Sequence, residues 1–89
     1  MPERAVTLRN ASGLHARPAK VFATAAAGLA ADVTVSKDGR EVNGKSVLSV
    51  LTLDCHKGDQ IVIRTEGEGA EEALADLVHL VESGLGETE

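Results

Sequence analysis

The sequence predicts an α+β fold in which a four-stranded, largely antiparallel sheet carries helices on one face. Segments that alternate apolar and polar side chains, typical of strands, are interleaved with segments that show the apolar spacing of helices. An Asp38-Gly39 pair near the centre favours a tight hairpin turn, which joins antiparallel strands. Because the 89 residues contain no linker, repeat or low-complexity segment, we expect one domain over residues 1–89.

The first half of the chain has the pattern of a strand, a helix and a hairpin. Turn residues follow the first alternating segment, and the helical spacing that begins at Ala16 places Ala19, Phe22, Ala23 and Ala26 on one face. Gly28 is a natural end for this helix. The expected strands cover residues 5–9, 32–36 and 41–43, with the helix over residues 16–28.

Residues 46–52 fit a short helix or a strand. The valines at 47 and 50 favour a strand because they are β-branched. Ser46 is a good N-cap, and Leu48, Leu51 and Thr52 recur at helical spacing, so we expect a helix.

The last part of the chain predicts a strand over residues 60–64 and then the most regular helix. Glu71 and Glu72 lie in its first turn, where the helix dipole favours negative charge, and Gly84 or Gly86 is expected to end it. Its apolar stripe comprises Ala70, Ala73, Leu74, Leu77, Val78 and Val81.

The composition argues against nucleic-acid binding and against a membrane span. The formal net charge is −5, no Lys/Arg cluster occurs, and Phe22 is the only aromatic residue, so neither phosphate attraction nor base stacking is provided for. Residues 22–31 form the longest stretch of low polarity, which is too short for a bilayer. A lone Cys55 and an N-terminus without a signal-peptide pattern lead us to expect a cytoplasmic protein.

The segment from Gly13 to Ala19 joins the first strand to the first helix and holds the candidate reactive group. His15 lies at or just before the helix N-terminus, where unpaired backbone N–H groups form a seat for a phosphate. Arg17 adds a donor fork suited to phosphoryl oxygens, and Pro18 fits the first helical turn. Either His15 or Arg17 could be the cap. A neutral imidazole is nucleophilic near pH 7, although the spacing alone equally permits a solvated cap.

Residues 10–19, Asn-Ala-Ser-Gly-Leu-His-Ala-Arg-Pro-Ala, resemble the active-site signature of HPr, the histidine-containing phosphocarrier of the sugar phosphotransferase system. Residues 44–51 resemble that family's regulatory serine motif, and the resemblance extends over essentially the whole chain. It implies an open-faced sheet with three helices on one side. It also implies that Enzyme I, charged from phosphoenolpyruvate, phosphorylates His15 on Nδ1, and that the phosphoryl passes to a IIA transporter domain.

The resemblance further assigns roles to the neighbours of His15. Arg17 would stabilise charge, and Ser12 with the backbone amides of Ala16 and Arg17 would hold the phosphate. A protein of this family is not strictly an enzyme, because it is consumed and regenerated as a phosphorylated intermediate. No cofactor is expected, and we expect a monomer.

Ser46 resembles the serine that HPr kinase/phosphorylase modifies in many relatives, and its phosphate would lie at a helix N-terminus, where negative charge is favoured. The alternative, given equal weight, is that Ser46 serves only as the N-cap of the short helix. Lys20, with the apolar Val47, Leu48 and Leu51, is expected to dock partners. Positions 24, 27 and 49 lack the basic residues that HPr proteins commonly carry there. A nitrogen-branch or regulatory relative that acts by binding proteins, such as a transcriptional regulator, therefore remains open.

No metal site is expected from the sequence. Cys55 and His56 are adjacent, so their side chains point apart, and His79 is assigned to the polar face of the last helix. We expect Cys55 to be buried, His56 to be a solvated loop residue, and Asp54 to belong to a solvated surface.

Overall fold

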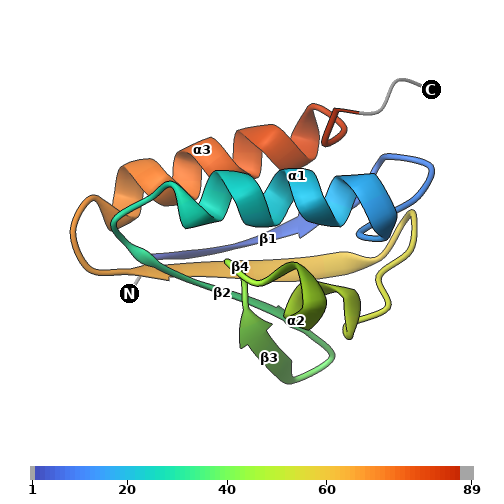
Figure 1. Cartoon of the computed structure of the whole chain (residues 1–89), viewed down its shortest axis with the longest axis horizontal. Helices are drawn as coiled ribbons and strands as arrows, with labels where there is room; N and C mark the ends of the chain where they lie inside the picture. Colours follow the sequence, from blue (N-terminus) through green and yellow to red (C-terminus); the bar gives the residue numbers. More distant parts are fainter. Residues whose placement is uncertain (1, 87–89) are drawn as a thin grey trace.

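The computed structural model describes residues 2–86, which form a sheet with helices packed over one face (Figure 1). This confirms the α+β prediction, including the short helix expected within residues 46–52. The elements in chain order are β1 (Glu3–Thr7), α1 (Ala16–Ala27), β2 (Asp32–Lys37), β3 (Arg40–Asn43), α2 (Val47–Leu51), β4 (Gln60–Glu66) and α3 (Ala70–Glu82).

The four strands lie in the order β1-β4-β2-β3, and every neighbouring pair is antiparallel. The last strand in sequence is therefore central, between β1 and β2. The β2–β3 hairpin turns at Asp38 and Gly39, whose φ angles are 52° and 83°. Two successive residues with positive φ are typical of a type I′ turn, which matches the twist of the flanking strands and explains the Asp-Gly pair.

The core lies between the sheet and helices α1 and α3, which run side by side across the same face (Figure 1). Alternate strand residues point into it, whereas those between them, such as Thr34 and Val62, are only half-buried on the open face. The largest fully buried side chains here include those of Phe22, Leu8, Leu14, Ile61, Ile63, Leu77 and Leu85. Among residues 2–86, no helix has the length and apolar character needed to cross a membrane.

The predicted bounds of the first strand were wrong, and β4 continues two residues beyond the predicted residue 64, to Glu66. The first strand covers Glu3–Thr7 rather than residues 5–9, because its extent is set by pairing with β4, which ends at Thr7 opposite Gln60. Leu8 still bonds outside the strand: its N–H donates to Asp59 O at 2.9 Å. Helix α3 ends at Glu82 with Ser83 as its C-cap, and Gly84 follows with a φ of 96°, so this glycine ends the helix as predicted.

Candidate functional site

His15 is the N-cap of α1, with an extended backbone (φ −117°, ψ 157°), which decides between the two caps that the sequence allowed. Among the described residues, the backbone N–H groups of Ala16 and Arg17 donate to no carbonyl outside the helix. Pro18 has no N–H to satisfy. The start of a 12-residue helix therefore presents free amide donors beside the imidazole, as anion binding requires.

Ala16, the first helical residue, has a φ of 49°. This left-handed conformation costs a non-glycine residue roughly 1–2 kcal/mol. Local strain of this kind persists where the surrounding structure imposes it, and such sites are often functional. The turn from His15 into α1 is thus held in place by its surroundings.

Close packing of two loops provides that constraint. Gly13 has a φ of 59°, and a Cβ atom at this position would lie 2.4 Å from the carbonyl oxygen of Cys55. The next N–H, that of Leu14, donates to the same oxygen at 3.0 Å. Only glycine permits this approach, which places the loop before α1 directly against residues 54–56.

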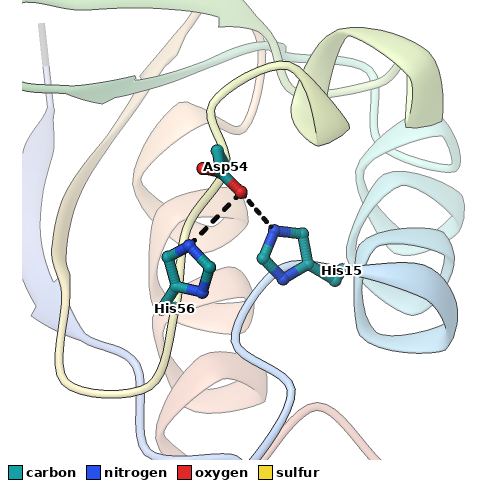
Figure 2. A group of neighbouring side chains, drawn as sticks. All are labelled: His15, Asp54 and His56. Atoms are coloured by element: carbon teal, nitrogen blue, oxygen red, sulfur yellow. Dashed lines mark hydrogen bonds and ion pairs between the residues drawn. The ribbon is translucent and has the colours of Figure 1, made fainter.

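The loop packing brings His15, Asp54 and His56 together (Figure 2). His15 Nε2 lies 2.9 Å from Asp54 Oδ1, and His56 Nε2 lies 3.3 Å from the same oxygen. The two rings meet edge to face with centroids 4.8 Å apart. On the other side of the ring, His15 Nδ1 is 3.2 Å from the carbonyl oxygen of Ser12. Hydrogen bonds from His15 and then His56 hold the pKa of Asp54 below its ordinary value.

Asp59 fixes the loop that carries Asp54 and His56. Its carboxylate accepts the backbone N–H of His56 at 2.8 Å and pairs with Lys37 Nζ at 3.0 Å. These two interactions lower the pKa of Asp59, and the hydrogen bond to Asp59 raises that of Lys37. Lys37 also donates to the carbonyl oxygen of Asp54 at 3.0 Å. The end of β2 and the loop before β4 are therefore tied together beneath the histidines.

The residues predicted to bind the phosphate lie at or just before the start of α1. Arg17 is exposed and makes no ion pair or hydrogen bond with any described residue, so its guanidinium is available to an incoming anion. Ser12 contributes its carbonyl oxygen to His15, a contact different from the expected role in phosphate binding. His15 keeps 33% of its side-chain surface exposed, so the ring can be reached from solvent.

Sequence reasoning missed Asp54 and His56 as neighbours of His15. Both are exposed, as expected, but they contact His15, which lies 39 positions before Asp54 in the sequence. The only local signals were the glycine at 13 and the turn at residues 57–59. Cys55 is buried, as predicted, and burial raises the pKa of its thiol. His79 is exposed on α3.

Ser46 caps α2, since its side-chain oxygen accepts the N–H of Ser49 at 3.2 Å. The predicted docking residues around it differ in exposure. Leu48 is 77% exposed, the only large apolar side chain so exposed among the described residues, whereas Val47 and Leu51 are half-buried. Lys20 is exposed on α1, which packs against α2.

The fold and site define a small open-faced α+β protein with an accessible histidine at a helix N-terminus. The family model described as "PTS HPr component phosphorylation site" matches residues 2–83. The phosphocarrier protein HPr of Streptomyces coelicolor is 48% identical over 88 residues, covering 98% of this chain and 95% of that protein. The HPr-like protein Crh of Bacillus subtilis is 35% identical over 82 residues, with 92% and 96% covered.

Solved structures agree with the sequence relatives. An HPr structure from Thermoanaerobacter tengcongensis superposes with a TM-score of 0.96 at 37% identity, covering all of both chains. A second structure from that organism, an HPr dimer, gives a TM-score of 0.77 at 38% identity over 98% of this chain and 100% of that one. The chain belongs to the HPr family of phosphocarrier proteins of the phosphotransferase system.

Proposed function

We propose that this chain accepts a phosphoryl group from phosphorylated Enzyme I on Nδ1 of His15 and passes it to the IIA component of a sugar transporter. The N-cap position of an accessible His15, beside the free amides of Ala16 and Arg17, is the observation that carries the proposal. The Nδ1 lone pair forms the new N–P bond as the bond to the leaving group on Enzyme I breaks, and the leaving atom keeps its electron pair. The reverse sequence delivers the phosphoryl to the next carrier.

Asp54 supports attack by Nδ1 rather than Nε2. A neutral imidazole has one N–H, and two acceptors compete for it: the Asp54 carboxylate at 2.9 Å from Nε2 and the Ser12 carbonyl at 3.2 Å from Nδ1. A hydrogen bond to a carboxylate is about twice as strong as one to a neutral group, so the proton resides on Nε2. The Nδ1 lone pair then faces another lone-pair-bearing oxygen, which favours rotation of the ring toward a phosphoryl donor.

The helix start supplies the charge that the product needs. A phosphoryl on His15 is stabilised by the amides of Ala16 and Arg17, by the positive end of the helix dipole, and by the guanidinium of Arg17. Asp54 opposes this with a negative charge nearby. Part of that opposition is offset because the carboxylate also receives a hydrogen bond from the Nε2–H of the phosphorylated ring.

The test is phosphoryl transfer from labelled phosphoenolpyruvate through Enzyme I. Wild type is expected to take up one acid-labile, base-stable phosphoryl. His15→Ala should take up none, while His79→Ala, which changes an exposed histidine on α3, should behave as wild type. Label retained in His15→Ala would contradict the proposal, and so would label that resists acid.

A regulatory function at Ser46 is the second candidate, favoured by the position of this serine at the start of α2 beside the exposed Leu48. A phosphate added by an HPr kinase/phosphorylase would place about −1.5 to −2 charges next to that apolar side chain. A regulator acting mainly through protein binding, with a transcriptional regulator as partner, predicts that sugar uptake survives His15→Ala while carbon-source repression fails in Ser46→Ala. A carrier predicts that His15→Ala abolishes uptake.

We further propose that residues 1–89 act as one HPr-like domain in the cytoplasm. A monomer stays a prediction, since relatives of both types include dimers: one HPr structure and the solid-state structure of Crh are dimeric. Sedimentation equilibrium at the concentrations used for phosphoryl transfer distinguishes the two states.

A further inference from the structure

Phosphoryl transfer needs one imidazole, yet the structure gathers two imidazoles and a carboxylate on the surface. His15, Asp54 and His56 each direct one ligating atom into a common space, and these atoms all lie within 4.8 Å of one another (Figure 2). His56 has no role in the transfer described above. Its side chain is 60% exposed, so neither burial nor core packing accounts for its position.

The chemistry of the three groups identifies a class of ligand. Imidazole nitrogen and carboxylate oxygen are ligands of Zn²⁺ and similar transition metals, whereas Mg²⁺ and Ca²⁺ prefer oxygen alone. We infer that His15, Asp54 and His56 form a binding site for a divalent transition metal such as Zn²⁺, and that an occupied site prevents His15 from accepting a phosphoryl group. The second part rests on the proposed function, and the first does not.

The geometry is close to what a tetrahedral metal requires. With metal–ligand bonds of about 2.0–2.2 Å, ligating atoms lie roughly 3.4 Å apart. Asp54 Oδ1 is already 2.9 Å from His15 Nε2 and 3.3 Å from His56 Nε2. The contact between Asp54 and His15 must lengthen slightly and the imidazole nitrogens, which lie within 4.8 Å, must approach each other, and the side chains are exposed enough to turn. A fourth position remains open toward solvent.

A second contact has the form that metal-bound histidines use. A ligating imidazole nearly always donates its other N–H to a carboxylate, a backbone carbonyl or water, which fixes the ring. His15 Nδ1 lies 3.2 Å from the carbonyl oxygen of Ser12, and Nε2 faces the metal position. The contact would be satisfied in the metal-bound state, in which Nδ1 keeps its proton.

This tautomer explains why metal and phosphoryl exclude each other. A metal on Nε2 requires the remaining proton to be on Nδ1, the nitrogen proposed to attack phosphorus. Phosphorylation requires the opposite, with the proton on Nε2 and donated to Asp54. The metal also attaches the His15 ring to the loop at residues 54–56, so the ring cannot turn toward Enzyme I.

Calorimetric titration of the unphosphorylated protein with Zn²⁺ tests the site directly. We expect one ion per chain, with affinity reduced at least about 10-fold in Asp54→Ala and His56→Ala. His79→Ala is the matched control, since it removes an exposed histidine outside the cluster, and it should bind as wild type. Mg²⁺ should give no comparable isotherm. Equal Zn²⁺ affinity in wild type and His56→Ala, or equal binding of Mg²⁺, would overturn the site.

The functional part is tested by adding Zn²⁺ to the Enzyme I assay, with each variant normalised to its own metal-free rate. Wild type should be slowed and His56→Ala should not, which separates binding to the carrier from inhibition of Enzyme I. Equal slowing of both would refute the antagonism. Failure of His15 to accept phosphoryl without metal would refute the proposed function, yet leave the zinc isotherm as an independent result.

Discussion

Asp54 is the residue through which His15 and His56 interact, and its ionisation reports on both. Its carboxylate accepts from each imidazole and is held by no other side chain among the described residues. The low pKa arises first from the hydrogen bond to His15 and then from that to His56. Removing either imidazole ring should therefore raise the pKa of Asp54 toward its ordinary value.

We predict that carboxyl-detected NMR titration will show Asp54 ionising below the ordinary aspartate pKa of about 3.9. His15→Ala and His56→Ala should each raise this pKa, and His79→Ala should leave it unchanged. Because the folded pKa is the lower one, Asp54 adds stability above the unfolded value, and this stability is lost as the pH falls through the folded value. An ordinary pKa in wild type would show that the imidazoles do not contact Asp54.

The loop before α1 and the loop before β4 form one unit, and Gly13 is the residue that allows their contact. Its positive φ and the 2.4 Å approach of its would-be Cβ to Cys55 O are two separate obstacles to substitution. Gly39 offers a matched comparison, since its φ is also positive but nothing lies within 4 Å of its would-be Cβ. Substitution of Gly39 introduces backbone strain alone, whereas substitution of Gly13 introduces both backbone strain and steric overlap.

Gly39→Ala should reduce the free energy of unfolding by roughly 1–2 kcal/mol, the cost of a left-handed alanine. Gly13→Ala should cost at least about 1 kcal/mol more, because the loops must also separate. It should also slow phosphoryl uptake by displacing His15. Chemical denaturation measures the first effect. Equal losses in the two variants would contradict the loop contact.

Helix α2 is only five residues long, so its cap contributes a large share of its stability. Ser46→Ala should lower the free energy of unfolding by about 0.5–2 kcal/mol, because the N–H of Ser49 loses its acceptor. Ser46→Asp keeps an acceptor and should retain most of that stability, while its charge should weaken transfer from Enzyme I. Denaturation curves measure the capping role of Ser46, and the transfer assay measures the effect of a negative charge at this position. A fully stable Ser46→Ala would exclude the capping role.

Across the molecule as a whole, one face of the sheet is buried, and the surface that we propose for docking partners lies on α1 and α2. Leu48 projects from that surface with 77% of its area exposed. Leu48→Ala should change stability by less than about 0.5 kcal/mol, yet raise the KM for this carrier in the Enzyme I reaction roughly 5-fold or more, as expected for an apolar anchor. Ala75→Ser, an exposed change on α3, is the control. An unaltered KM would remove Leu48 from the docking surface.

The sequence predicted those features that depend on local pattern. Alternation located the strands, the apolar stripe from Ala70 to Val81 located α3, and Asp38-Gly39 located the hairpin. His15 was placed at the helix start because capping and Pro18 are local signals. Asp54 and His56 could not be placed beside it, since their approach depends on a contact between loops 39 positions apart. The first strand was misplaced by two residues for a related reason, because pairing with β4 fixes its extent.

In the proposed carrier, the phosphoryl group resides on Nδ1 of His15 while Asp54 holds the proton on Nε2. Phosphorus- and nitrogen-resolved NMR of the protein labelled with ¹⁵N in its histidines, recorded after phosphorylation by Enzyme I, tests this directly. We predict phosphorus–nitrogen coupling to Nδ1 of His15 and to no nitrogen of His56 or His79. Coupling to Nε2 of His15, or to another histidine, would contradict it.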